Sequence, residues 1–337
     1  MKRCTRCVLP ETFPGVRFDD EGVCHFCRQD LSPEREAGQK ERLLHRFEDL
    51  VRRVRPRSTY HCLVSWSGGK DSTYTLWLLR NRYKLRILAF TFDNGFVSPA
   101  AFQNIRTVAE NLKIDHMIVK PRFDILRKVF LASMDPSMYP LRALERASGI
   151  CNSCMALAKG IALQIALGQE IPILAYGWSP GQIPLASAYF RTNHAILKAM
   201  NETAKAPLEK VAGRQIDVYF PRESRLERME SPPSIVAPLA FLSYSEKEAL
   251  QRIRKLGWER PKDTDPNSTN CLLNSLSIVT HTEQHGYHPY AMELSGLVRR
   301  GCMTRVEAIE RLQAEPQREI LAAAKAKLGL PLSEPGR

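Results

Sequence analysis

The sequence lacks several features that would place a protein in a membrane or outside the cell. No apolar run approaches the ~20 residues that a membrane-spanning helix needs. The basic start MKRCTRC is not followed by the apolar core of a signal peptide. Internal repeats and low-complexity tracts are also missing. We therefore expect a cytoplasmic protein without a membrane partner, and 337 residues suffice for one sizeable α/β domain with smaller appendages.

Charge and cysteine content narrow the chemistry further. The formal net charge of +13 suits a polyanionic partner such as nucleic acid or ATP. It suits an ordinary basic surface equally well, because the basic residues are scattered along the chain. Nine cysteines without a secretion signal indicate metal binding or catalysis before disulfides.

One glycine turn stands out in the stretch LVSWSGGKDSTYTLWLL, residues 63–79. It matches neither the P-loop pattern GxxxxGK[ST] nor GxGxxG. The apolar residues before Gly68 and Gly69 predict a buried parallel strand, and Ser72 is placed to cap a following helix. Glycine amides approach an anion closely, and a helix N-terminus favours negative charge. The stretch therefore predicts a phosphate site, with a tight turn that binds no ligand as the alternative.

The hexapeptide SGGKDS resembles the SGGxDS signature of the PP-loop ATP pyrophosphatases. That superfamily includes tRNA thiolation enzymes, GMP synthetase, asparagine synthetase and N-acetyl sugar amidotransferases. The resemblance implies an adenine nucleotide alpha hydrolase-like fold in which ATP adenylates an acceptor oxygen, pyrophosphate leaves, and nitrogen or sulfur displaces AMP. It implies that Lys70 neutralises the pyrophosphate and that Asp71 acts through Mg²⁺, a hard cation that prefers oxygen ligands. The ATP-binding residues that it implies here are Ser65, Ser67, Gly68, Gly69, Lys70, Asp71 and Ser72.

The rest of the chain predicts more of the same sheet. RILAFTFDNG (86–95), HMIVKP (116–121) and IPILAYGWSPGQ (171–182) are typical of strands, and AAFQNIRTVAENLKI (100–114) of a helix. Strands that alternate with helices predict an α/β fold with a doubly wound parallel sheet. The family resemblance places the end of the second strand near the adenosine, which adds Asp93 to the predicted ATP site. Gly177, in the glycine loop that follows the strand at 171–176, is also assigned to that site. A turn-forming Asp-Asn-Gly is the alternative for Asp93.

Three regions are expected along the chain. Residues 1–40 would form a Cys4 zinc knuckle, residues 41–235 the PP-loop domain, and residues 236–337 a helical C-terminal region that contributes Cys271. Residues 41–55 predict an amphipathic helix that leads from the knuckle to the sheet. Residues 221–234 are charged and loop-like, as in a linker or an active-site lid.

The first cysteine group has the spacing of a structural metal site. Cys4, Cys7, Cys24 and Cys27 form two C-x2-C pairs that are separated by sixteen residues. Four thiolates give a closed tetrahedral zinc site, and a segment of about thirty residues with little core needs such a cross-link. The alternatives are an iron site or free thiols.

The second cysteine group bears on mechanism. Cys151 and Cys154 open one predicted helix, and Cys271 opens another. Three thiolates can hold a 4Fe-4S cluster and leave one iron open to a further ligand. A CxxC followed at long range by one cysteine, inside a PP-loop protein, is similar to the iron-sulfur-dependent tRNA 2-thiolation enzymes. A second zinc site, a redox disulfide and plain burial are the alternatives.

Two branches of the superfamily compete. Both ends of the chain, CTRCVLPETFPGVRFDDEGVCHFC and VRRGCMTRVEAIERL, resemble the N-acetyl sugar amidotransferases of bacterial surface-polysaccharide synthesis. The cysteines at 151, 154 and 271 match the thiolation enzymes instead, but the GHxxDD stretch of those enzymes is replaced here by GWSPGQ at 177–182. A nucleic-acid-binding zinc protein is a third possibility.

We therefore predict an ATP-dependent, adenylating, sulfurtransferase-like enzyme with Mg²⁺, Zn²⁺ and a 4Fe-4S cluster. Its acceptor is a small molecule, a sugar or a tRNA. Lys159, on the same predicted helix as Cys154, could polarise that acceptor, although a solvated lysine is the plainer interpretation. A protein that donates sulfur or ammonia and a second copy of the chain are the expected protein partners.

Overall fold

One six-stranded sheet organises the computed structural model, which describes residues 2–30, 32–54, 59–265 and 267–331. The strand order is β3–β2–β1–β4–β6–β5. The strands are β1 (Cys62–Ser65), β2 (Ile87–Phe92), β3 (Asp115–Val119), β4 (Ile173–Tyr176), β5 (Tyr189–Arg191) and β6 (Ser234–Val236). The pairs β1–β2, β1–β4, β2–β3 and β4–β6 are parallel, which confirms the predicted α/β class.

The edge strand β5 departs from the prediction of a wholly parallel sheet, because it pairs with β6 in the antiparallel direction. Only a loop and the short 3-10 segment η2 (Leu185–Ser187) separate β4 from β5. A parallel strand needs a crossover that carries the chain back to the other edge of the sheet, and that connection is usually a helix. Without one, the chain enters β5 from the edge where β4 ended.

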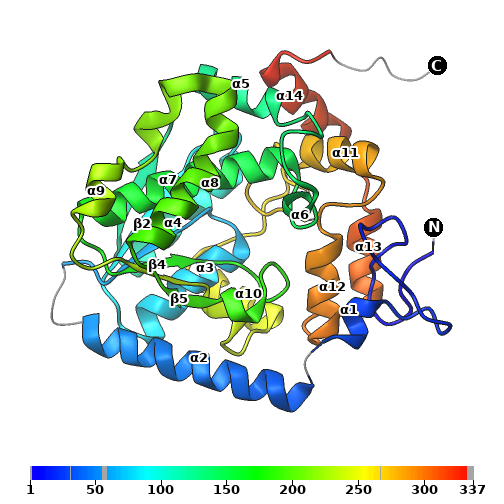
Figure 1. Cartoon of the computed structure of the whole chain (residues 1–337), viewed down its shortest axis with the longest axis horizontal. Coiled ribbons are helices and arrows are strands. Elements are labelled where there is room, and N and C mark those ends of the chain that lie inside the picture. The colour runs from blue at the N-terminus through cyan, green and yellow to red at the C-terminus, as the bar shows by residue number, and fades with distance from the viewer. Residues whose placement is uncertain (1, 31, 55–58, 266, 332–337) are drawn as a thin grey trace.

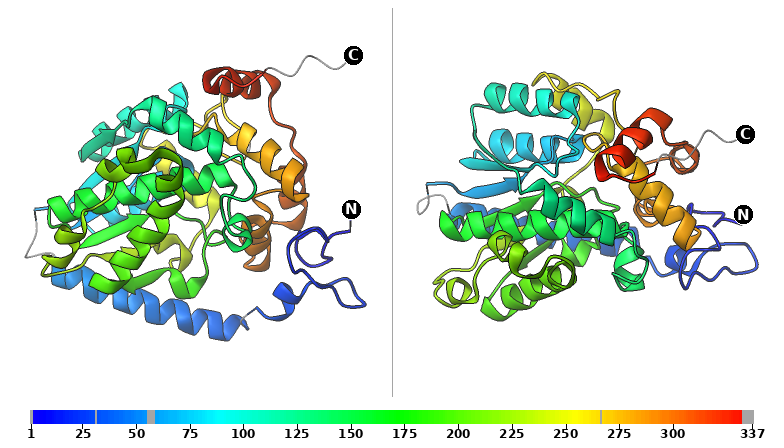
Figure 2. Two further views of the ribbon diagram at one scale, coloured as in Figure 1. Left: turned by 45° about the horizontal axis from the view of Figure 1, so that its top comes forward. Right: turned by 90° about the horizontal axis from the view of Figure 1, so that it is seen from above.

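Helices lie on both faces of the sheet (Figures 1 and 2). They are α1 (His25–Arg28), α2 (Pro33–Val54), α3 (Lys70–Trp77), α4 (Pro99–Leu112), α5 (Phe123–Ala132), α6 (Leu141–Leu144), α7 (Gly149–Gly168), α8 (His194–Ala212), α9 (Glu223–Glu227), α10 (Glu246–Arg254), α11 (Asn274–His285), α12 (Ala291–Arg299), α13 (Arg305–Gln313) and α14 (Arg318–Leu328). The π-helical turn η1 (Leu78–Arg82) continues α3, and η3 (Gly213–Tyr219) and η4 (Pro238–Ala240) are 3-10 segments.

Two separate cores explain the double winding. Neighbouring residues of a strand point to opposite faces. Val64 of β1 therefore packs in one core with residues of α2, α3, α4 and α10. Leu63 packs in the other with residues of α5, α7, α8, α11 and α14. Both residues are fully buried, as expected for a strand in a sheet covered on both faces.

Helix α7 is long and apolar enough to cross a membrane by length and composition alone. A helix of this length and composition was not predicted from the sequence. Half of its most apolar stretch is buried inside the protein, where the helix packs against β1, β4 and α8. Its apolar character thus fits the central helix of one core.

The two ends of the chain share a third core. The four knuckle cysteines pack with apolar residues of α12 and α13, among them Leu294 and Leu312. Arg305 of α13 donates to the carbonyl oxygens of Cys7 at 3.0 Å and Cys4 at 3.1 Å. Figure 1 shows the N-terminal segment beside these two helices.

Two of the predicted features of chain organisation, the boundary after residue 235 and the linker at 221–234, can be compared with the sheet. A boundary after residue 235 falls inside β6, which pairs with β4 in the sheet. Residues 221–234, predicted as a linker or lid, contain α9 and run directly into β6.

Candidate functional site

The loop between β1 and α3 makes the predicted glycine turn at the carboxyl end of β1. Gly68 has a φ of +78°, and a Cβ there would lie 2.8 Å from the Ile105 side chain. The prediction that Ser72 caps the helix is wrong, because α3 begins at Lys70 with Gly69 as its N-cap. The hydroxyl of Ser72 instead donates to the Gly69 carbonyl at 3.0 Å and lies 3.1 Å from the hydroxyl of Ser67. The two serines therefore close the turn together.

A distant segment supplies an oxygen to the start of α3. The backbone N–H of Lys70 donates to Thr269 Oγ1 at 3.0 Å. The indole of Trp258 donates to the Gly68 carbonyl at 3.0 Å and so fixes the turn from the other side. Backbone N–H groups at a helix N-terminus point outward, toward the position that a phosphate oxygen would take. The Lys70 N–H, which already donates to an oxygen, has this orientation.

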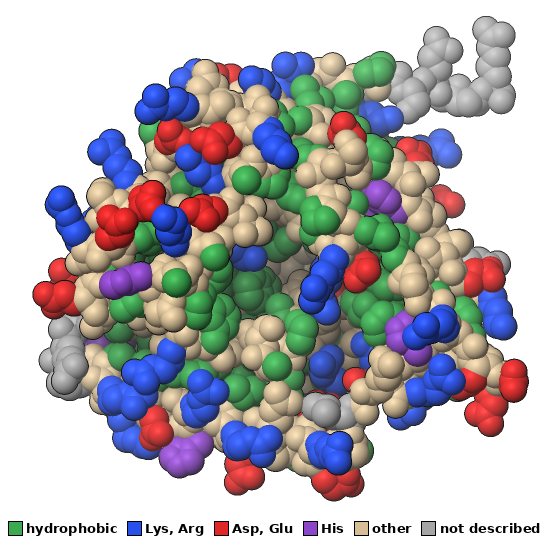
Figure 3. Space-filling model, viewed as in Figure 1, with side chains coloured by type: hydrophobic (Ala, Val, Ile, Leu, Met, Phe, Trp, Pro, Cys, Tyr) green, Lys and Arg blue, Asp and Glu red, His purple; other side chains and the backbone are tan. Residues whose placement is uncertain are grey.

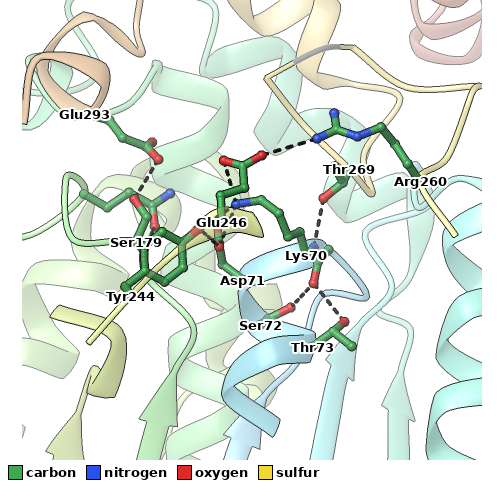
Figure 4. A network of polar contacts seen from close by, with 12 residues as sticks. Lys70, Asp71, Ser72, Thr73, Ser179, Tyr244, Glu246, Arg260, Thr269 and Glu293 are labelled. Carbon is green, nitrogen blue, oxygen red and sulfur yellow. Dashed lines mark hydrogen bonds and ion pairs between the residues drawn. The ribbon is translucent and has the colours of Figure 1, made fainter. Parts of the chain in front are cut away.

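The side chain of Lys70 lies in an acidic network (Figure 4). Its Nζ is 2.8 Å from Asp71 Oδ1, 3.3 Å from Glu246 Oε2 and 2.7 Å from the Tyr244 hydroxyl. Tyr244 in turn donates to Asp71 at 2.6 Å. Arg260 and Arg311 reach Glu246 from outside the network. The carboxylates of Asp71 and Glu246 thus hold the ammonium group of Lys70 beside the turn.

Burial and charge set the protonation of this network. Burial and the neighbouring Asp71 raise the pKa of Tyr244, which therefore stays a hydrogen-bond donor. Burial alone would raise the pKa of Glu246, but the charges of Lys70 and Arg311 outweigh it and lower that pKa. The lowered pKa keeps the Glu246 carboxylate ionised beside the turn, and carboxylate oxygens are the ligand type that Mg²⁺ prefers.

The other predicted ATP residues surround the same turn. Ser65 ends β1 and is in register with Tyr176 at the end of β4. Gly177 packs against the backbone of Ser72, where a Cβ would lie only 2.3 Å from the Ser72 Cα. Asp93 Oδ1 accepts from the Gly95 N–H at 2.8 Å, which is the turn-forming role given as its alternative.

The three cysteines of the second group come together although they lie far apart in the sequence. The side-chain amide of Asn94 is 3.4 Å from the sulfur of Cys154 and 3.6 Å from that of Cys271. Cys151 lies 3.3 Å from the hydroxyl of Ser277. Cys151 and Cys154 are in the first two turns of α7 as predicted, but Cys271 precedes α11 rather than opening it.

The state of the three thiol groups bears on what Cys151, Cys154 and Cys271 could bind. All three cysteines are free of disulfides and keep some exposed surface. Burial, with the nearby Cys151, raises the pKa of Cys271 to about 11, so metal binding must displace thiol protons. Three thiol groups gathered in one place are a ligand set that either a zinc ion or an iron-sulfur cluster can use.

The four cysteines of the knuckle lie close enough together to share one metal ion. All four ligand sulfurs lie within 4.8 Å of one another and are buried. The Cys4 and Cys27 sulfurs are 3.9 Å apart, and the Cys7 and Cys24 sulfurs 3.6 Å. These separations are close to the ~3.8 Å edge of a tetrahedral zinc–thiolate site. The residues therefore fit one closed structural ion.

Lys159 is held against an aromatic side chain. Its Nζ lies 5.0 Å from the ring centre of Trp178, whose ring stacks at 4.6 Å on Tyr176. Burial lowers the pKa of Lys159, and the described residues offer it no carboxylate within ion-pair distance. This position at the end of β4 differs from the solvated lysine that the sequence made plausible. Figure 3 shows that the face drawn in Figure 1 is hollowed near its middle.

Several residues of the site carried no signal in the sequence. Tyr244, Glu246 and Thr269 reach the SGGKDS turn across more than 170 residues of chain. Asn94 lies in the predicted Asp-Asn-Gly turn, but nothing in that turn announced a contact with two cysteines. Local patterns cannot show such contacts, because the fold alone brings the segments together.

Comparison with known proteins gives distant likenesses. No protein-family profile matches the chain. An uncharacterized protein of Methanocaldococcus jannaschii is 22% identical over 315 residues, which cover 92% of this chain and 93% of that protein. The similarity thus extends over most of both chains but comes with no known activity.

Solved structures show the same degree of likeness. The U34-tRNA thiolase NcsA from Methanococcus maripaludis, solved with its [4Fe-4S] cluster, has a TM-score of 0.38 and 16% identity and covers 100% of this chain and 92% of its own. NMN synthetase from Francisella tularensis has a TM-score of 0.35 and 15% identity, covering 91% and 100%. NH3-dependent NAD synthetase from Campylobacter jejuni has a TM-score of 0.32 and 12% identity, covering 69% and 99%. Likeness at this level assigns no activity to this chain.

Proposed function

We propose that this protein is an AMP-forming enzyme of the PP-loop type that adenylates an acceptor oxygen and then replaces it with sulfur. The observation that carries the proposal is the short segment 267–271, which links both halves of the site. Thr269 of this segment contacts the Lys70 N–H of the PP-loop, and Cys271, two residues later, joins Cys151 and Cys154. An ATP-binding turn and a thiol trio are thereby adjacent.

The residues present would divide the work as follows. The amides and serines of the SGGKDS turn would bind the pyrophosphate of ATP, with Lys70 neutralising it and Asp71 binding Mg²⁺. Cys151, Cys154 and Cys271 would hold a 4Fe-4S cluster, whose open iron supplies a place for a sulfur ligand. Lys159 of α7 lies against Trp178, which follows β4, and its ammonium group would polarise the acceptor. The knuckle would hold Zn²⁺ in a structural role.

The first test is iron, acid-labile sulfide and zinc analysis of anaerobically purified protein, followed by an assay with MgATP and sulfide. About four irons and one zinc per chain, together with AMP and pyrophosphate formed with bulk tRNA as acceptor, support the proposal. Colourless protein with zinc alone, after attempted reconstitution, contradicts it. Activity with ammonium and a UDP-N-acetyl sugar favours the amidotransferase that both chain ends resemble. Tight RNA binding without pyrophosphate release favours a nucleic-acid-binding zinc protein.

Replacing Lys70 by alanine should abolish most of the adenylation step. The variant loses the ammonium group beside the turn and leaves the carboxylates of Asp71 and Glu246 without their shared cation. We therefore expect pyrophosphate formation to fall about 10²-fold or more. Lys247→Ala removes an exposed lysine beside Glu246 and is the matched control. Equal rates for both variants would exclude Lys70 from phosphate binding.

Replacing Cys24 by serine should loosen both ends of the chain. The knuckle shares its core with α12 and α13, so loss of the metal should reach these helices. We expect less than one zinc per chain, a Tm lower by about 5 °C or more, and faster amide exchange in α12 with unchanged exchange in α4. A variant that retains zinc and the Tm of the native protein would contradict this role.

A further inference from the structure

The loop that follows β4 receives a carboxylate from a distant helix. Residues 177–182 contain no acidic side chain. Ser179 of this loop nevertheless donates its hydroxyl to Glu293 Oε1 at 2.8 Å, and Glu293 belongs to α12 near the C-terminal end of the chain (Figure 4). The carboxylate thus lies at the carboxyl edge of the sheet, where the PP-loop also lies.

Close backbone packing fixes this carboxylate in place. A Cβ at Gly181 would lie 2.2 Å from the carbonyl oxygen of Glu293. On the facing side, a Cβ at Gly296 would lie 3.0 Å from the Cα of Gly181. Only two glycines allow loop and helix to touch in this way. The side chain of Gln182 accepts from the Ser179 N–H at 2.8 Å and holds the loop in the same conformation.

The surroundings suit a group that changes its protonation state. Burial raises the pKa of Glu293 to about 7, the hydrogen bond from Ser179 opposes that rise, and the charge of Asp71 adds to it. The charged and titratable groups that face it are Lys70 and Asp71 from α3, Tyr244 before α10, and Tyr290, the N-cap residue of α12. Glu293 as a residue is partly rather than fully buried.

We propose that Glu293 accepts the proton that the attacking nucleophile loses when it displaces AMP, an inference that rests on the proposed function. A hydrosulfide ion forms a bond to the activated acceptor carbon. The carbon–oxygen bond to AMP breaks, and its electron pair leaves with the phosphate oxygen. The S–H proton passes to the Glu293 carboxylate and from there to water. No net oxidation or reduction occurs, so the step needs no further reactant.

The experiment compares wild type and Glu293→Gln, which has nearly the same shape. The assay uses MgATP, sodium sulfide and bulk tRNA, or MgATP, ammonium and a UDP-N-acetyl sugar, whichever pair yields AMP from the wild type. We expect single-turnover pyrophosphate formation within about twofold of wild type and a transfer step slower by about 10²- to 10⁴-fold. The total sulfide is raised at each lower pH so that the hydrosulfide concentration stays constant. The transfer rate of the wild type should then fall below pH about 7, where the Glu293 carboxylate becomes protonated. The residual rate of Glu293→Gln should lack this acid limb.

Two further variants make the test specific. Ser179→Ala removes the hydrogen bond that lowers the pKa of Glu293, so the acid limb should move to higher pH. Glu310→Gln changes an exposed glutamate on the neighbouring helix α13 and should leave rates and pH profile unchanged.

The outcomes separate the two proposals. If Glu293→Gln transfers at the wild-type rate with the wild-type acid limb, Glu293 has no role in proton transfer, and the proposed function stands. If the wild type forms no pyrophosphate from ATP with sulfide and bulk tRNA, the proposed sulfur transfer fails. If neither acceptor pair yields pyrophosphate, this inference fails with it.

Discussion

Replacing Cys271 by alanine should remove most of the iron from the protein and abolish sulfur transfer. The change would leave only Cys151 and Cys154 to hold the proposed cluster, which is too few thiolates for a stable 4Fe-4S site. We expect iron to fall from about four to below one per chain after anaerobic reconstitution, with loss of the broad visible absorption. Zinc should remain at about one per chain, because the knuckle lies in a different core from Cys271.

The same variant should keep the first half of the reaction. Thr269 still bonds to the Lys70 N–H, and the serines of the turn are unchanged. Pyrophosphate formation in a single turnover should therefore stay within about tenfold of wild type, since the nucleophile acts only after pyrophosphate has left.

A second cysteine gives the matched control. Cys302 is half-buried, and its sulfur donates to the Arg300 carbonyl at 3.8 Å, away from the trio. Cys302→Ser should keep iron, colour and transfer. If Cys271→Ala remains brown with a full complement of iron, the cluster does not use that thiol, and the sulfur-transfer proposal loses the observation that carries it.

The parts of the site that the sequence predicted are those that depend on local chain geometry. The SGGKDS turn follows a run of apolar strand residues and precedes a helix, so its place at the edge of the sheet could be derived from residues 63–79 alone. The pairs Cys4–Cys7 and Cys24–Cys27 could likewise be assigned to one metal site from their spacing.

The remaining parts depend on contacts that no local pattern encodes. Glu246 and Tyr244 belong to a segment with the appearance of an ordinary helix start, and only the packing of α10 on α3 brings them to Lys70. The sequence could predict that Lys159 shares helix α7 with Cys154. It could not predict the contact of Lys159 with Trp178, which follows β4. The antiparallel β5 shows the same limit, because the strand's direction follows from a missing crossover helix rather than from its three residues.

Replacing Gly177 by alanine should disrupt the proposed ATP site through packing alone. The added Cβ would lie 2.3 Å from the Cα of Ser72 and 2.7 Å from its backbone nitrogen. Neither is the flexible end of a side chain, so the end of β4 and the first turn of α3 must move apart. Overpacking of this kind costs about 1–3 kcal/mol. Because Ser72 also fixes Ser67 and the Gly69 carbonyl, we expect MgATP to bind at least about tenfold more weakly.

Gly38→Ala separates this local effect from a general effect of glycine replacement. Gly38 lies inside α2, where the atom nearest to an added Cβ is the end of the Arg42 side chain at 3.5 Å. Alanine should stabilise that helix by roughly 0.5–1 kcal/mol and leave MgATP binding unchanged. Isothermal titration with MgATP and thermal unfolding of both variants provide the comparison. If Gly177→Ala binds MgATP as the wild type does, the approach of β4 to Ser72 does not shape the nucleotide site, and the pyrophosphate must bind farther from Ser72 than the SGGKDS turn implies.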